Sequence, residues 1–226
     1  DVVKLELAGE VKRVHLEDEV LETRTVIFST GSAYRKLGLE EEDKYSGHGV
    51  SYCATCDGFF FRDQDIIVVG GGDSAMEEAT FLTAFAKSVT VVHRRDELRA
   101  SAAMAKRALE NPKIKFAWNS RVSALHGEGA LESVTLTDTV TGQTRELEAT
   151  GLFVAIGSSP RSELVRDQLE LDAAGYVVVS HPSTRTNVPG VFACGDVADP
   201  TYRQAITAAA SGTRWPRSPP LRACQS

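Results

Sequence analysis

The stretch from Asp65 to Leu109 constrains the fold more than any other part of the chain. It reads "DIIVVGGGDSAMEEATFLTAFAKSVTVVHRRDELRASAAMAKRAL". Apolar runs predict buried strands over Ile66 to Val69 and Val89 to Val92, and the pattern between them predicts a helix from about Ser74 to Lys87. Strands that alternate with helices in this way predict an α/β fold with a parallel, doubly wound sheet.

The turn after the first of these strands has the form of a dinucleotide-binding loop. In "VVGGGDSA", Gly70, Gly72 and Ala75 occupy the three small-residue positions of a G-x-G-x-x-A pattern. Gly70 allows the tight turn, Gly72 lets the backbone approach a pyrophosphate, and Ala75 lets the helix pack closely on the strand. The pattern has the strand and the helix that it requires on either side, so it predicts a dinucleotide site.

The end of the second strand selects between the two nicotinamide cofactors. An NAD site places an acid there, but this chain reads "HRRDELR". Arg94, Arg95 and Arg99 can surround a 2′-phosphate, whose charge an acid would repel. A solvated basic turn is the alternative, and the cluster at this place in the motif favours NADPH.

Short strands and turns dominate the rest of the chain. They are expected before Ser32, from Ile114 to Ala149, and in "GLFVAIG", "YVVVS" and "GVFACGDVA", while "TYRQAITAAASG" starts a helix of small residues. These breaks predict three segments: 1–32 and 160–226 as the two parts of one domain, and 33–159 as a domain inserted between them. A single domain with long loops is the alternative.

Composition narrows the partners. The net charge of −6 provides no general attraction for nucleic acid or anionic lipid. A helix needs about 20 apolar residues to span a bilayer, and every apolar run in the chain is much shorter. We therefore expect no nucleic acid and no membrane partner. The first residues contain no apolar block of the kind found in a signal peptide. Four cysteines in 226 residues, only two of them close together, suggest a reducing cytoplasm.

The close cysteine pair lies in "SYCATCDGFF". Zinc is disfavoured because no second C-x-x-C or histidine pair completes four ligands, so we expect no metal. A structural disulfide over so short a loop adds little stability, whereas this spacing suits a redox disulfide of Cys53 and Cys56. Asp57 is either a proton donor and acceptor for the thiolates or a turn acid. A dithiol needs a flavin to receive hydride from NADPH efficiently, so a flavin is expected. Phe59, Phe60 and Phe61 are expected to pack rather than to take part in the chemistry.

Together these motifs resemble the low-molecular-weight thioredoxin reductases. The resemblance rests on "CATCDGFF", "VVGGGDSAMEEA", "HRRDELRAS", "GLFVAIG" and "GVFACGDVADPTYRQAITAAASG", in order, from about Thr25 to Gly212. It implies two Rossmann-like three-layer domains, an NADPH domain inserted into an FAD domain. It also implies that electrons pass from NADPH through FAD to the Cys53–Cys56 disulfide and then to thioredoxin, in a homodimer.

The resemblance also implies a role for each matching residue. Asp57 would protonate during reduction, the glycine loop would line the pyrophosphate of NADPH, and Cys194 would be a small buried residue. The implied NADPH contacts are Gly70, Gly72, Ser74, Ala75, Arg94, Arg95 and Arg99. Ile156 and Gly157 are further implied cofactor contacts. The implied FAD contacts are Gly195, Asp196, Arg203, Gln204 and Ala205.

Two departures from the family pattern stand out. No strand–glycine–helix unit for the ADP half of FAD precedes Asp1, which suggests a fragment or a weakened FAD site and uncovered apolar faces at "VIFST" and "VFACG". From about residue 213 the sequence becomes proline-rich, which forbids a helix there and suggests a reading-frame slip. Cys224 is assigned no function.

Two other functions stay open at this stage. A related flavoenzyme would use another disulfide partner or oxidise a small dithiol, and a non-catalytic module would bind NADPH without turnover. A swing of the inserted domain about Ser32 and Ser158 is a further hypothesis, because the disulfide has to meet both flavin and partner.

Overall fold

The computed structural model describes residues 1–214; the proline-rich tail and Cys224 lie outside the described residues. The chain forms two compact units. The split unit consists of residues 1–33 and the chain from Ser158 onward, and the inserted unit consists of Tyr34–Gly157. The assignment of these units to FAD and NADPH stays a prediction.

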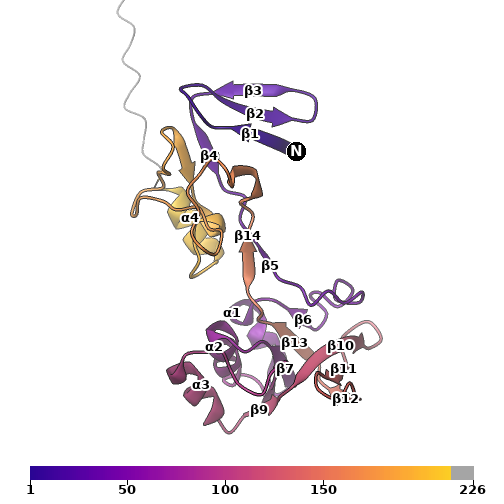
Figure 1. Ribbon diagram of the computed structural model, residues 1–226. Coiled ribbons are helices and arrows are strands. Elements are labelled where there is room, and N and C mark those ends of the chain that lie inside the picture. The colour runs from indigo at the N-terminus through magenta and orange to yellow at the C-terminus, as the bar shows by residue number, and fades with distance from the viewer. Residues whose placement is uncertain (215–226) are drawn as a thin grey trace, which may run out of the picture. The chain divides into compact units, whose positions relative to one another are not determined.

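The inserted unit is built on a five-stranded parallel sheet in the order β6-β13-β7-β8-β9. Ile66 and Val68 of the central strand pack toward the helices, and Ile67 packs toward a second, antiparallel sheet. Figure 1 shows the helices and the antiparallel strands on opposite sides of the parallel sheet. Parallel strands buried on both faces are continuous apolar runs, which explains "DIIVV" and "GLFV".

These are the elements of the inserted unit. The parallel strands are β6 (Val50–Ser51), β7 (Asp65–Val69), β8 (Ser88–Val92), β9 (Ile114–Ala117) and β13 (Gly151–Val154). The helices are α1 (Ala54–Asp57), α2 (Asp73–Leu82) and α3 (Ala102–Leu109). The antiparallel strands are β10 (Ser120–His126), β11 (Ser133–Asp138) and β12 (Thr144–Glu148).

The split unit combines a three-stranded antiparallel sheet, β1-β2-β3, with the short parallel pair of β4 and β15. Its core gathers Leu5, Phe28, Val165, Val191 and other apolar residues. Its elements are β1 (Val2–Glu6), β2 (Lys12–Leu16), β3 (Val20–Thr23), β4 (Val26–Phe28), β15 (Val191–Ala193) and α4 (Ala205–Gly212). The strands β5 (Ser32–Tyr34) and β14 (Ser158–Pro160) pair with each other where the chain passes between the units.

The predicted α/β class with a parallel sheet is confirmed, and several local expectations are wrong. The helix after the glycine turn ends at Leu82, because the N–H groups of Ala84 and Phe85 bond three residues back and tighten the chain. Tyr176–Ser180 is no regular strand, since it makes one isolated bridge. The strand at "GVFACGDVA" covers only Val191–Ala193 before a 3₁₀ turn.

The expected uncovered faces are only partly found. The side chains of Val191, Phe192, Ala193 and Cys194 are all buried, so "VFACG" is covered within the described chain. Ile27 of β4 is exposed, as expected for "VIFST". Val191 and Ala193 of β15 and Phe28 of β4 belong to one apolar core, and Ile27 lies outside it.

Candidate functional site

The cysteine segment connects β6 to the short helix α1. Cys53 caps α1, and its Sγ accepts a hydrogen bond from the N–H of Cys56 at 3.2 Å. The two cysteines form a disulfide, with their Cα atoms 5.3 Å apart. Cys53 is half-buried and Cys56 is exposed. The disulfide is therefore accessible to a thiol from outside the unit.

Asp57 is the last residue of α1 and lies beside this pair. Its Oδ2 accepts a hydrogen bond from Ser51 Oγ at 2.7 Å, and the same hydroxyl accepts from the N–H of Cys53 at 3.1 Å. The structure thus brings Cys53, Cys56 and Asp57 together. Ser51 did not emerge from the sequence, although its position two residues before the first cysteine was a possible signal.

The three phenylalanines after the cysteine pair do not share one environment. Phe61 packs against Phe153 with ring centroids 5.1 Å apart, as expected. Phe59 is 59% exposed, although its ring lies edge-on to that of Phe85 with centroids 6.2 Å apart, and Phe60 is 74% exposed. Neither ring is buried in the core. Exposed aromatic rings so close to an accessible disulfide provide an apolar surface for contact with another molecule.

The glycine loop follows β7 at the carboxyl edge of the parallel sheet. Gly70 has φ +151°, and a Cβ there would lie 2.4 Å from the carbonyl oxygen of Ala155 and 2.7 Å from Cβ of Ala75. Ala75 is fully buried at the base of α2, which begins at Asp73. A Cβ on Gly72 would meet nothing within 4 Å, so the backbone there is open to a ligand.

The basic loop after β8 is bonded to the glycine loop. The N–H of Arg99 donates to the carbonyl oxygen of Gly71 at 2.7 Å. Ser101 donates from its N–H and its hydroxyl to one oxygen of Asp73, at 2.7 and 2.9 Å. Arg94, Arg95 and Arg99 are exposed, and within residues 1–214 they make no ion pair. Three uncompensated cations beside the loop suit a phosphate group.

His93 is a residue of this site that sequence reasoning missed, although it stands first in "HRRDELR". It is buried, and a Cβ on Gly71 would lie 2.2 Å from its Cε1, so the imidazole occupies the space that a side chain at Gly71 would need. Burial lowers the pKa of His93, and the charges of Arg99, Arg94 and Arg95 act in the same direction. The ring is therefore neutral at pH 7.

The end of β13 lies beside the glycine loop. β13 pairs in parallel with β7, and the N–H of Ala155 donates to the carbonyl oxygen of Val69 at 2.9 Å. Ile156 and Gly157 follow directly, Gly157 with φ +99°. Carboxyl ends of parallel strands meet at one edge, which is where ligands of such sheets bind. The structure thus places Gly70, Ile156 and Gly157 at the same edge.

The other predicted cofactor residues lie in the split unit. Gly195 has φ +74° and donates its N–H to Ser211 Oγ at 2.9 Å. Asp196 Oδ1 is buried and has no hydrogen-bond partner among the described residues. A buried acceptor left without a donor is costly, so a hydroxyl from a bound ligand fits this position. Cys194 is a buried free thiol, and burial raises its pKa.

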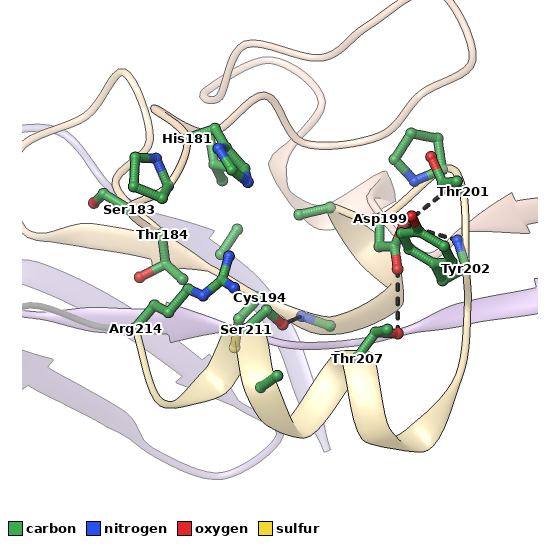
Figure 2. A pocket seen from close by; sticks show the side chains of 17 residues that line it. His181, Ser183, Thr184, Cys194, Asp199, Thr201, Tyr202, Thr207, Ser211 and Arg214 are labelled. Carbon is green, nitrogen blue, oxygen red and sulfur yellow. Dashed lines mark hydrogen bonds between the residues drawn. The ribbon is translucent and has the colours of Figure 1, made fainter.

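Asp199 organises the turn that precedes α4. Figure 2 shows its carboxylate bonded to the N–H groups of Thr201 and Tyr202 and to the hydroxyl of Thr207. Burial opposes the effect, yet N–H donation from Tyr202, Thr201 and Arg203 keeps the pKa of Asp199 below its usual value. The turn holds Arg203 at φ +48°, a conformation that L-residues rarely adopt.

Arg203, Gln204 and Ala205 follow this turn at the start of α4. Arg203 donates to the hydroxyl of Tyr176 at 3.3 Å, Gln204 caps the helix, and Ala205 is exposed. The split unit also contains a cavity of about 440 Å³ (Figure 2). Its lining includes Cys194, Gly195, Asp199, Tyr202, Thr207 and Ser211.

Two negative findings concern the described residues. Residues 1–214 contain no group of three or more His, Cys, Asp or Glu side chains placed to hold a metal ion. In the same part of the chain, no helix has the length and apolar character needed to pass through a bilayer.

Comparisons with known proteins place these features in a family. Residues 1–212 match the model of the pyridine nucleotide-disulphide oxidoreductase family. The chain is 64% identical to a thioredoxin reductase of Streptomyces clavuligerus over 213 residues, which is 94% of this chain and 66% of that protein. It is 58% identical to a thioredoxin reductase of Mycolicibacterium smegmatis, covering 94% of this chain and 68% of the relative.

A solved structure gives the same result. The crystal structure of thioredoxin reductase from Streptococcus pyogenes aligns with a TM-score of 0.88 at 46% identity, covering 94% of this chain and 69% of that one. The chain thus spans about two thirds of the length of the proteins it matches.

The chain belongs to the pyridine nucleotide-disulphide oxidoreductase family and, within it, to the thioredoxin reductases, which confirms the resemblance seen in the sequence. This family depends on FAD and NADPH, the two predicted cofactors.

Proposed function

We propose that this protein catalyses the NADPH-dependent reduction of thioredoxin, with Cys53 and Cys56 as the redox-active disulfide. The observation that carries the proposal is the accessible Cys53–Cys56 disulfide in the same compact unit as the glycine loop and the basic loop. Relatives at 58% and 64% identity that are thioredoxin reductases support it.

NADPH binds at the carboxyl edge of the parallel sheet in this proposal. The open backbone at Gly72 and the N-terminus of α2 at Ser74 receive the pyrophosphate, while Gly70 and Ala75 allow the close packing beneath it. Ile156 and Gly157 line the same edge. The 2′-phosphate is bound by the exposed guanidinium groups of Arg94, Arg95 and Arg99.

FAD binds to the split unit in this proposal. The unpartnered Asp196 Oδ1 and the cavity lined by Gly195 support its placement there. Arg203, Gln204 and Ala205 are assigned to the same site because of the family resemblance. When bound, FAD supplies a two-electron carrier between the nicotinamide and the disulfide.

The redox pair then reduces the partner by thiol–disulfide exchange. The dithiol of Cys53 and Cys56 gives two electrons and two protons to the disulfide of thioredoxin, which becomes a dithiol while the Cys53–Cys56 bond re-forms. Asp57 exchanges protons with the sulfurs. Cys56 is the more exposed of the two cysteine residues, and the exposed rings of Phe59 and Phe60 offer an apolar contact to the protein partner.

The remaining parts of the proposal concern assembly and location. The family resemblance supports a homodimer, and the small number of cysteines supports a cytoplasmic location. Sedimentation of the purified protein tests the dimer, and fractionation of cells tests the location.

Replacement of either cysteine tests the catalytic proposal. In Cys53→Ser or Cys56→Ser, thioredoxin reduction by NADPH in the presence of FAD should fall below about one thousandth, because no disulfide can form or open. NADPH binding, measured by calorimetry, should be unchanged. Cys224→Ser is the matched control. Retained turnover in either variant would overturn the proposal.

A further inference from the structure

Ser51 is a buried hydroxyl at the redox pair that the mechanism above does not use. It ends β6, is 4% exposed, and lies opposite Phe153 of the neighbouring strand β13. Its position is therefore set by the parallel sheet rather than by the short helix that follows. A side chain held by a sheet is a rigid support for groups in a loop.

The hydroxyl bonds two parts of the redox segment at once. Ser51 Oγ donates to Asp57 Oδ2 at 2.7 Å, a charge-assisted hydrogen bond, and accepts from the N–H of Cys53 at 3.1 Å. A longer contact of 3.4 Å joins it to the carbonyl oxygen of Cys53. One oxygen thus connects the acid to the backbone of the first cysteine.

Asp57 has no other hydrogen bond to its side chain among the described residues. It ends a helix of only four residues, and Gly58 follows it. Without Ser51, nothing in the described chain would fix the direction of this carboxylate. From these contacts we propose that Ser51 is a positioning residue, which holds the Asp57 carboxylate beside the Cys53–Cys56 pair. This inference rests on the proposed redox role of the two cysteines.

The effect of Ser51 on the equilibrium between disulfide and dithiol depends on whether the two sulfurs carry hydrogen. Reduction by dithiothreitol breaks the Cys53–Cys56 bond, adds two electrons and two protons to the pair, and leaves the reagent as a cyclic disulfide. Sulfurs of the disulfide carry no hydrogen, whereas a thiol can donate to a carboxylate. A carboxylate held in place therefore favours the dithiol, and removal of Ser51 favours the disulfide.

The test measures the equilibrium between the Cys53–Cys56 disulfide and dithiothreitol in the full chain. Redox buffers are quenched with an alkylating reagent, and the masses give the fraction reduced. Ser51→Ala should shift the equilibrium constant about tenfold toward the disulfide, or about 30 mV for a two-electron couple. Asp57→Asn should shift it in the same direction. Ser123→Ala, which removes a hydroxyl from β10 of the same unit, should leave it unchanged.

The double variant separates positioning from simple backbone capping. If Ser51 acts through Asp57, Ser51→Ala should add less than about twofold in the Asp57→Asn background. Ser51→Thr keeps the hydroxyl, so its redox equilibrium should stay close to that of the wild-type protein. Circular dichroism checks that each variant is folded. A wild-type equilibrium in Ser51→Ala, or fully additive effects in the double variant, would overturn the inference.

The measurement is independent of the proposed function because it uses no NADPH, flavin or thioredoxin. A protein that shows the expected Ser51 coupling but reduces no thioredoxin would contradict the proposed function alone and would support the inference.

Discussion

Two isoleucines, one in each unit, sit in parallel strands with very different surroundings. Ile67 of β7 is fully buried, and its strand has neighbours on both edges. Ile27 of β4 is 48% exposed, and within residues 1–214 its strand pairs only with β15. A groove of about 400 Å³, lined by Val26, Ile27 and Phe28 among others, runs along β4.

The comparison shows how the two proposed cofactor sites are supported. In the inserted unit, the glycine loop and the basic loop stand on a sheet that is covered on both faces. In the split unit, Gly195 and Asp196 follow a strand of three residues in a two-stranded sheet. The first site therefore has a complete core beneath it, and the second depends more on local turns such as that of Asp199.

The matched isoleucines give the largest expected contrast. Ile67→Ala should lower the free energy of unfolding of the inserted unit by about 2 to 5 kcal/mol, because it leaves a cavity in a packed core. Ile27→Ala should cost less than about 1 kcal/mol, since much of its side chain is already in water. Urea unfolding followed by circular dichroism measures both. Equal losses would show that burial does not distinguish the two strands.

Substitution of two adjacent glycines tests how the His93 ring packs in the inserted unit. Gly71→Ala should destabilise it by about 1 to 3 kcal/mol, because the new methyl group would overlap the buried ring of His93. Gly72→Ala should change stability little, since its Cβ would meet nothing within 4 Å. Thermal unfolding of both variants measures the difference. If the two are equally stable, His93 does not occupy the space above Gly71.

Selectivity for the 2′-phosphate tests the basic loop. Arg94→Gln and Arg95→Gln should each weaken NADPH binding about tenfold, the loss of one charge-assisted contact, and should leave NADH binding nearly unchanged. Calorimetric titration with the two nucleotides measures this. Arg121→Gln, an exposed arginine of β10 without an ion pair among the described residues, is the control. A parallel loss for NADH would argue against a phosphate contact.

The smallest effect is a pH dependence from His93. Because its pKa is lowered in the folded state, the unfolded chain binds more protons as the pH falls below the usual value for histidine. The stabilisation is fully present above about pH 6.5 and declines as the pH falls below that value. His93→Gln should reduce this slope in urea unfolding, and an unchanged slope in that variant would contradict the prediction.

Local pattern predicted much of the inserted unit. The apolar run before Gly70, the glycine turn and the basic loop are each encoded within a few consecutive residues, so period and turn chemistry suffice to find them. The end of α2 and the irregular course of Tyr176–Ser180 were missed. At the end of α2, the N–H groups of Ala84 and Phe85 bond three residues back, which the apolar pattern does not encode. In Tyr176–Ser180, the N–H of Val177 donates to the distant carbonyl oxygen of Val197.

The local sequence pattern also did not predict which side chains are exposed. "GFFF" is uniformly apolar, yet Phe61 packs on Phe153 while Phe59 and Phe60 face solvent. Which ring is buried depends on strand β13, about 90 residues away along the chain. The same holds for His93, whose partner at Gly71 lies on a different strand–helix connection.

The amino-acid sequence by itself determined the class of fold, the family and the chemical nature of the cysteine pair, because each depends on residue types at short, regular spacings. Only the tertiary structure decided which groups meet: Ser51 with Asp57, Gly71 with His93, and Asp196 with no partner in the described chain. Such contacts follow from how strands pair and pack, and packing joins residues whose separation along the chain carries no signal.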